Sequence, residues 1–179
     1  MLYCMAEQQN GKLHLLSLTC KIMREAFKLE QIGIIHSPFK TKEDCPVQGI
    51  LNPSAAGRVE LFPGYQEGLE TIETFTHIYL FYIFNQSNEV ILSRPTFFDD
   101  NPHGIFASRH PCRPNSIGMS IVKLEQKNGN ELIVSGIDVL DQTPLIDIKP
   151  YIPRFDYFEN AGNGWVEGLP VRPKPKNRE

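Results

Sequence analysis

Residues 117–126 read IGMSIVKLEQ and residues 131–140 read ELIVSGIDVL, with KNGN between them. The two apolar-rich segments predict β-strands. The Asn128-Gly129 pair between them favours a tight turn, because both residue types tolerate positive φ angles. This stretch therefore predicts a β-hairpin, and it points to a β-rich fold.

Further strands are predicted at residues 27–35, 58–62, 76–84, 90–92, 104–108 and 145–149. Segment 76–84 is the most apolar and is expected to form a central strand. Apolar residues recur at helical spacing over 65–75 and predict one short helix, which Gly68 weakens. Four prolines between residues 93 and 115 predict loops around the strand at 104–108. Many short strands with one or two short helices indicate a mainly-β, single-domain barrel or sandwich.

The chain has 179 residues and a formal net charge of −3. This length predicts one domain, and the charge argues against long-range capture of nucleic acid by a basic surface. No apolar run is long enough to span a membrane, and no basic segment precedes residues 13–18, so we expect a soluble, cytoplasmic protein. We expect residues 1–26 to be a weakly structured extension, residues 27–158 to be the barrel domain, and residues 159–179 to be an irregular, basic, proline-rich tail.

Two polar segments stand out between apolar strands, where functional sites tend to lie. Arg109 and Arg113 share a loop stiffened by proline, which favours either anion binding or a solvated surface loop. In segment 138–149, Asp147 and Lys149 share one face of a strand, where they could pair or border a site. For Asp138 and the nearby Asp141 we favour a local turn leading into Thr143-Pro144.

Metal binding and several common enzyme classes are not supported by the motifs. Asp99, Asp100 and His103 are metal-ligand types, but neighbouring residues of an extended chain point to opposite faces. The histidines and the four cysteines fit no usual zinc spacing, so we expect no metal. The chain also lacks a phosphate-binding loop, a nucleophile elbow and an HExxH motif.

Five ordered motifs carry a family resemblance. They are EQIGIIHSPFK at 30–40, CPVQ at 45–48, GLETIETFTHIYLFYIF at 68–84, GIFASRHPCRPNSIGMS at 104–120 and DVLDQTPLIDIKPYIP at 138–153. Together they resemble the TsaA/TrmO family of S-adenosylmethionine-dependent tRNA methyltransferases over about residues 29–158. The resemblance implies a β-barrel methyltransferase fold, S-adenosyl-L-methionine as cofactor, tRNA as partner and a homodimer. The implied reaction is N-methylation of N6-threonylcarbamoyladenosine beside the anticodon.

The resemblance also implies the positions of the site residues. The cofactor contacts would be Gly49, Ile50, Leu51, Asn85, Gln86, Ser108, Arg109, Gly118, Gln142, Thr143, Pro144 and Leu145. The nearby candidates for a general base are Asp138, Asp141 and Asp147, and the pattern does not choose among them. Candidates for binding substrate or anion are Arg113, Asn115 and Lys149.

Three residues depart from the family pattern. Val47 stands in place of an arginine, Ser116 in place of a proline, and Gln142 in place of a glycine, which removes easy access to positive φ. Two alternatives to the tRNA methyltransferase stay open. One is a small-molecule methyltransferase with the same cofactor pocket, and the other is a non-catalytic module that binds S-adenosylmethionine or RNA.

Overall fold

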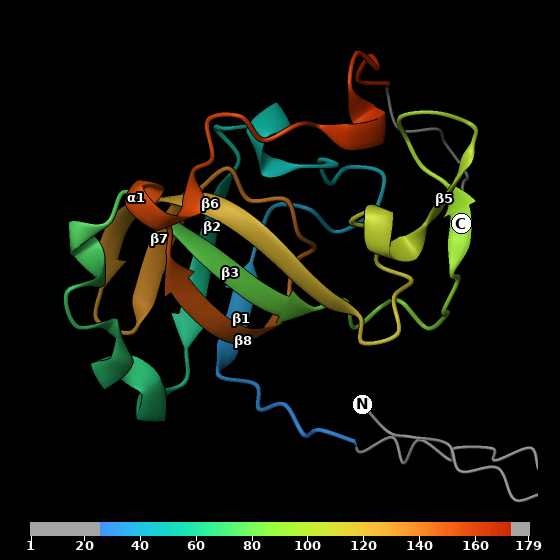
Figure 1. Ribbon diagram of the computed structural model, residues 1–179. Helices are drawn as coiled ribbons and strands as arrows, with labels where there is room; N and C mark the ends of the chain where they lie inside the picture. Colours follow the sequence, from blue (N-terminus) through green and yellow to red (C-terminus); the bar gives the residue numbers. More distant parts are fainter. Residues whose placement is uncertain (1–25, 173–179) are drawn as a thin grey trace, which may run out of the picture.

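Six antiparallel strands close into a barrel in the computed structural model, which describes residues 26–172 (Figure 1). Around the barrel the order is β1-β2-β7-β6-β3-β8, and pairing of β8 with β1 closes it. The mainly-β barrel predicted from the sequence is confirmed. The strands are β1 (Gly33–His36), β2 (Ala56–Leu61), β3 (His77–Ile83), β6 (Ile117–Asn128), β7 (Glu131–Ser135) and β8 (Thr143–Pro150).

Strand β3 is the central strand that its apolar sequence predicted. It pairs with β6 on one side and β8 on the other. Its residues alternate between the barrel interior and the outside, and Ile78 and Leu80 have no exposed surface. This alternation is the period of a strand with one buried face, so the interior side chains of β3 anchor the core.

The predicted hairpin forms from β6 and β7. Gly129 in the turn has a φ of 62°, the left-handed conformation that the Asn-Gly pair predicted. Strand β6 continues to Asn128, two residues beyond its expected end, whereas β7 stops at Ser135. Residues 136–141 then leave the sheet, and Ile137 and Val139 bury their side chains in the core.

The helix expected over residues 65–75 is wrong. Two 3-10 helices stand there instead, η2 (Pro63–Leu69) and η3 (Ile72–Thr74). Thr71 separates them with a φ of 63°, a left-handed conformation that no continuous helix can contain. Leu69 and Ile72 are still buried. The apolar spacing therefore identified buried residues correctly but did not indicate an α-helix.

Residues 84–116, called the insertion here, lie beside the barrel rather than in it (Figure 1). They contain a separate two-stranded sheet of β4 (Ser93–Pro95) and β5 (Pro102–Gly104), followed by η4 (Ile105–Ala107). The strands expected at 90–92 and 104–108 are therefore wrong. Likewise, the opening strand begins at Gly33 and not at residue 27.

The remaining short elements are η1 (Gly49–Leu51), α1 (Pro153–Asp156) and η5 (Gly164–Val166). The predicted extension, apart from residue 26, and the basic end of the tail lie outside the described residues. The boundaries 1–26, 27–158 and 159–179 stay predictions. Between residues 26 and 172, no helix is both long and apolar enough to cross a membrane.

Candidate functional site

The predicted cofactor residues come from distant parts of the chain but converge on one end of the barrel. Strand β3 runs antiparallel to β6 and β8, so its last residues lie beside their first residues. Tyr82 pairs with Gly118 on one side and with Leu145 on the other. Asn85 and Gln86 follow β3 at the same end, which we call the site end.

Asp138 connects the helix η1 to the barrel at the site end. Its Oδ2 accepts the backbone N–H of Gly49 at 2.7 Å, and its Oδ1 accepts the hydroxyl of Ser120. Ser120 Oγ in turn lies 3.0 Å from the hydroxyl of Tyr82. Because the one Ser120 proton goes to the carboxylate, Tyr82 donates to Ser120. A chain of three polar side chains thus ends on the N–H of Gly49, and in it Tyr82 and Ser120 are buried and Asp138 is partly buried.

Burial sets the protonation behaviour of this chain. It raises the pKa of the Asp138 carboxyl, although the Ser120 and Gly49 donors and the charge of Arg109 offset part of the effect. Burial also raises the pKa of the Tyr82 hydroxyl, which stays neutral. A carboxyl with a raised pKa in a polar cluster is a feature of functional sites. Asp138 and its partners therefore form the strongest site candidate among the three aspartates.

Two glycines at this end allow close packing that a side chain would prevent. A Cβ on Gly118 would lie 2.1 Å from Cε2 of Tyr82, whose ring covers the strand. A Cβ on Gly49 would lie 2.1 Å from the carbonyl oxygen of Gly136. Both contacts are far below van der Waals distance. The Tyr82 ring and the η1 backbone can therefore take their positions only over glycine.

Asp141 has a structural role. Its Oδ1 accepts the backbone N–H of Ser37 at 3.0 Å, and Lys40 donates to its other oxygen. Burial alone would raise its pKa, but the Lys40 ammonium and the Ser37 N–H outweigh it and lower the pKa. The predicted turn into Thr143-Pro144 forms at residues 141–142. The carboxylates of Asp138 and Asp141, however, bond across the fold rather than within that turn.

Asp147 and Lys149 lie away from the site end. Lys149 Nζ is 2.7 Å from Asp147 Oδ2, so the two residues pair as one of the predicted alternatives. Asp147 stands opposite Phe81 in the middle of β3, and both charged side chains are well exposed. The structure therefore does not bring these two candidates together with Asp138.

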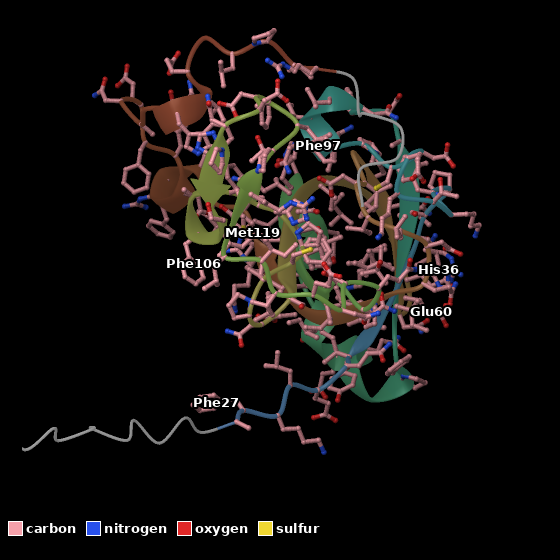
Figure 2. All side chains as sticks on the ribbon, turned by 90° about the vertical axis from the view of Figure 1, so that its right-hand side faces the viewer. Phe27, His36, Glu60, Phe97, Phe106 and Met119 are labelled. Carbon is pink, nitrogen blue, oxygen red and sulfur yellow. The ribbon has the colours of Figure 1, made fainter. Side chains whose placement is uncertain are left out.

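The turn at residues 142–145 begins β8 at the site end. Gln142 has a φ of 64°, so it takes the left-handed conformation expected of a glycine. Its amide donates to Nδ1 of His36 at 3.0 Å, and Nε2 of His36 bonds Glu60 at 3.0 Å (Figure 2). Thr143 donates to the carbonyl of Leu140 and is buried. Leu145 points into the core, which leaves Gln142 and Pro144 as the more accessible residues of this turn.

The two arginines of the predicted anion loop have internal partners. Arg109 donates to the side-chain amide oxygen of Gln48 at 2.6 Å, which links the insertion to the residue before η1. Arg113 donates to the carbonyls of Ile105 and Ser108 at 2.8 and 2.7 Å. Arg109 and Asn115 are exposed, whereas Arg113 is partly buried. Arg109 is therefore the more accessible of the two cations.

His110, between these arginines, is held neutral. Burial, followed by the charges of Arg94, Lys42 and Arg113, lowers its pKa from 6.5 to about 4. Its Nδ1 accepts the backbone N–H of Cys112 at 3.2 Å. A neutral imidazole at neutral pH supplies this acceptor, so His110 stabilises the loop rather than adding a charge to it.

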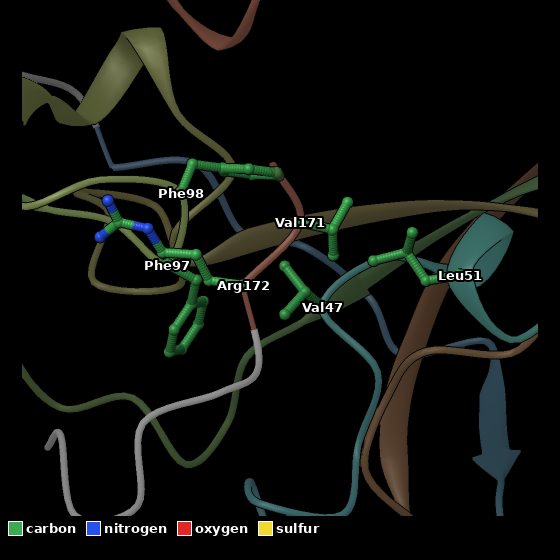
Figure 3. Close-up of a pocket in the computed structure, with 6 residues that line it drawn as sticks. All are labelled: Val47, Leu51, Phe97, Phe98, Val171 and Arg172. Atoms are coloured by element: carbon green, nitrogen blue, oxygen red, sulfur yellow. The ribbon is translucent and has the colours of Figure 1, made fainter. Parts of the chain in front are cut away.

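Val47 lines a small apolar pocket beside η1 (Figure 3). The other lining residues are Leu51, Phe97, Phe98, Val171 and Arg172. In the close-up, Val47, Leu51 and Val171 point toward one another, although Val171 lies far from the other two in the sequence. The valine in place of an arginine is thus matched by apolar neighbours from the insertion and from the C-terminal segment.

His103 is hydrogen-bonded to Asp99. His103 Nε2 lies 2.9 Å from Asp99 Oδ1, and the His103 ring stacks on Trp165 with centroids 3.7 Å apart. Across residues 26–172, no group of three or more histidine, cysteine, aspartate or glutamate side chains could hold a metal ion.

Sequence reasoning missed three participants, which are Gln48, Tyr82 and Ser120. Ser120 had a usable signal, because it occupies an inward-facing position on a strand whose other inward residues include Val122 and Leu124. A buried hydroxyl needs a hydrogen-bond partner, and Asp138 is that partner. Gln48 and Tyr82 had no comparable local signal, since their partners lie far away in the sequence.

The sequence profile of the family described as tRNA-methyltransferase O N-terminal domain matches residues 34–157. The chain belongs to this family. The family resemblance predicted from the five motifs is thereby confirmed.

Two relatives are similar over most of this chain. A probable S-adenosyl-L-methionine-binding protein of Pyrococcus abyssi is 48% identical over 136 residues, covering 76% of this chain and 74% of the relative. The tRNA (adenine(37)-N6)-methyltransferase of Escherichia coli is 34% identical over 156 residues, covering 82% of this chain and 66% of that enzyme.

Solved structures of the same family match the fold. A crystal structure of TrmO superposes with a TM-score of 0.69 at 40% identity, and one from Pseudomonas aeruginosa with 0.67 at 38% identity. The matches cover 78% and 79% of this chain but only 64% and 63% of those chains. The chain thus spans less than two thirds of the length of these solved relatives.

Proposed function

We propose that the protein binds S-adenosyl-L-methionine at the site end and transfers its methyl group to N6 of an adenosine in tRNA. The specific acceptor we propose is N6-threonylcarbamoyladenosine beside the anticodon. The observation that carries the proposal is the convergence of η1 and Ser120 on the partly buried Asp138 carboxyl, at the end of the barrel where the turn at 142–145 begins β8. Family membership and the functions for which the relatives are named support it.

The residues at the site end suit the parts of this cofactor. Ile50 and Leu51 present exposed apolar surface that can cover an adenine ring. The accessible Arg109 can bind the carboxylate of the amino-acid moiety, and the polar backbone of the turn at 142–145 can bind ribose. The bound cofactor would supply a methyl group on a positively charged sulfur.

Asp138 is the aspartate we propose for proton handling and positioning. Its raised pKa makes it a stronger base than Asp141, whose pKa is lowered. The N6 nitrogen of the acceptor is a poor nucleophile until its proton is removed, since its lone pair is delocalised. Asp138 also holds the N–H of Gly49 at 2.7 Å, so it fixes the position of η1.

The first experiment is methyl transfer from labelled S-adenosylmethionine to tRNA with and without threonylcarbamoyladenosine. Transfer only to the modified tRNA supports the proposed acceptor. Transfer to neither tRNA, with cofactor binding intact by calorimetry, contradicts the proposal and favours a small-molecule acceptor or a non-catalytic binding module.

Variants of Asp138 and Asp147 test whether Asp138 takes part in proton transfer or only positions η1. Asp138→Asn should reduce the transfer rate by about 100-fold or more at saturating cofactor, a usual size for loss of acid–base catalysis. Asp147→Asn is the matched control, because Asp147 lies in the middle of β8, and it should retain activity. Lost cofactor affinity in Asp138→Asn with an unchanged transfer rate would leave Asp138 as a positioning residue only.

We also propose that the protein forms a homodimer. We propose that it acts in the cytoplasm, where its tRNA substrate is found. The outer face of β3 and β6 supports the dimer, because Ile117 and Ile121 are 38% and 41% exposed and lie opposite Ile83 and Tyr79. Such a continuous apolar face on a sheet is typical of a subunit interface. Light scattering of Ile121→Glu should report a halved mass if this face forms the dimer.

A further inference from the structure

The turn η4 presents one exposed aromatic side chain next to the site end. Ile105 anchors the turn in the protein with 1% of its surface exposed, whereas the next residue, Phe106, is 78% exposed. Phe106 lies at the outer edge of the molecule in Figure 2. A single exposed phenylalanine is common on protein surfaces, so the surroundings of the Phe106 ring have to indicate whether it binds a ligand.

The turn is held rigidly by side chains from two other segments. Arg113 donates to the carbonyls of Ile105 and Ser108, on either side of Phe106. Trp165, from the C-terminal segment, donates its indole N–H to the carbonyl of Ala107 at 2.8 Å. These three contacts fix the backbone around Phe106. Its ring is therefore presented in a defined place before any ligand binds, which lowers the entropic cost of binding.

Positive charge lies beside the exposed ring. The Arg113 guanidinium is 5.8 Å from the centroid of the Phe106 ring, and Arg109 follows three residues later in the same loop. Proteins that bind unpaired nucleic acid combine an aromatic ring for base stacking with cations for the phosphates. This surface therefore matches the chemistry of a single-stranded RNA segment.

We propose that Phe106 is the platform on which an unpaired base of the RNA substrate stacks while a neighbouring base is at the site end. The proposal rests on the proposed function and names the residue that recognises RNA as single-stranded. Two kinds of partner could cover Phe106, which are an RNA strand and a second copy of this chain. The adjacent arginines favour the RNA, because they attract a polyanion rather than an apolar protein face.

The chain contains its own matched control. Phe155 is 66% exposed, and the Arg154 guanidinium lies 5.8 Å from its ring centroid. This pair has the same composition and spacing, but it belongs to α1, which follows β8 at the end of the barrel opposite the site end (Figure 1). An exposed ring and a guanidinium at the same distance are thus shared, whereas the position relative to the site differs.

The first test compares Phe106→Ala, Phe106→Tyr and Phe155→Ala in steady-state methylation of tRNA. Stacking of one base predicts that Phe106→Ala raises KM for tRNA by roughly tenfold and leaves the Kd for S-adenosylmethionine unchanged. Phe106→Tyr should keep the wild-type KM, and Phe155→Ala should match wild type. Unchanged KM in Phe106→Ala, with methylation intact, would overturn the platform and leave the proposed function standing.

The second test measures base stacking by fluorescence and does not depend on catalysis. Phe106→Trp is titrated with an RNA stem-loop that has an unpaired loop and with a fully paired RNA duplex, and the wild-type fluorescence from Trp165 is subtracted. Quenching by the stem-loop alone is the expected result. Equal quenching by both RNAs, or none, rejects the proposal even if methyl transfer occurs. Quenching without methyl transfer would instead reject the proposed function alone.

Light scattering separates the RNA platform from a subunit contact. Phe106→Ala should have the same mass as wild type at the same concentration. A lower mass for this variant would mean that a second copy covers Phe106, and it would overturn the proposal.

Discussion

The barrel and the insertion are stabilised in different ways. In the barrel, continuous antiparallel pairing surrounds a core in which Ile78, Leu80 and Leu132 have no exposed surface. In the insertion, Ile105 is the buried large apolar residue, and much of the backbone is held by side chains such as Arg113 and Trp165. Apolar burial stabilises the barrel, whereas polar contacts stabilise the insertion.

This difference assigns separate tasks to the two regions. A core built from buried apolar area tolerates few changes, but it depends little on any one hydrogen bond. A segment held by a few polar contacts can lose its local geometry while the barrel stays folded. Substitutions in the barrel should therefore act on global stability, and substitutions in the insertion should act mainly on the site.

The largest effect is expected from truncation in the barrel core. Leu80→Ala should lower the free energy of unfolding by about 2–5 kcal/mol, because it leaves a cavity in a fully buried part of β3. Urea unfolding measures this loss. Phe155→Ala, at an exposed position, should change stability by less than about 0.5 kcal/mol. Equal effects of the two variants would mean that the barrel does not have a tightly packed core.

A smaller loss is expected where the barrel meets the site. Gly118→Ala should cost about 1–3 kcal/mol, because the new Cβ would displace the Tyr82 ring. The displaced ring should disturb Ser120 and Asp138, so calorimetry should also report weaker binding of S-adenosylmethionine. Gly64→Ala is the control, since no heavy atom would lie within 4 Å of its Cβ. Normal cofactor affinity in Gly118→Ala would show that the hydrogen bonds from Tyr82 through Ser120 to Asp138 do not influence cofactor binding.

Loss of Arg113 should lower the local stability of the insertion and leave the stability of the barrel unchanged. Arg113→Met removes both bonds to the carbonyls around Phe106, and the local opening free energy of the turn should fall by about 1 kcal/mol. Hydrogen exchange of the Ser108 amide, which bonds Ile105, should accelerate while amides of β3 keep their protection. Faster exchange throughout the barrel would show that the two regions unfold together.

The smallest expected effect is a change in pH dependence at His110. Its folded pKa of about 4 lies below the ordinary 6.5, so the unfolded chain binds this proton more readily. The stabilisation from neutral His110 is complete above pH 6.5 and is lost as the pH falls toward 4. His110→Asn should therefore lose less stability than wild type over this range. Thermal unfolding at pH 4.5 and 8 tests the difference, and parallel pH profiles would contradict the assignment.

The sequence predicted the barrel better than the insertion for a physical reason. The hairpin at 117–140 and the central β3 have local signals, which are the Asn-Gly turn and a long apolar run. In the insertion, proline spacing predicted loops but not the β4-β5 sheet, because that sheet depends on pairing between short segments. The apolar spacing at 65–75 misled for a similar reason, since Thr71 breaks the helix in a way that spacing cannot report.

For the site, the motifs predicted which segments take part but did not distinguish the aspartates. Asp138 and Asp141 stand three residues apart and look alike in sequence. Their pKa values shift in opposite directions, because desolvation dominates at Asp138, whereas the bonds from Lys40 and Ser37 outweigh it at Asp141. These partners come from β6, η1 and the loop after β1, so no local pattern contains them.

By itself, the amino-acid sequence determined the family and the β-rich architecture, because periodicity, turn residues and motifs are local properties of the chain. It also predicted the segments of the candidate site. The tertiary structure decided which aspartate has a raised pKa, that Gln142 takes a left-handed conformation, and that Phe106 is exposed on a rigid turn. Those features depend on contacts between residues that are distant in the sequence. Such contacts set the burial, pKa and hydrogen bonding of each side chain.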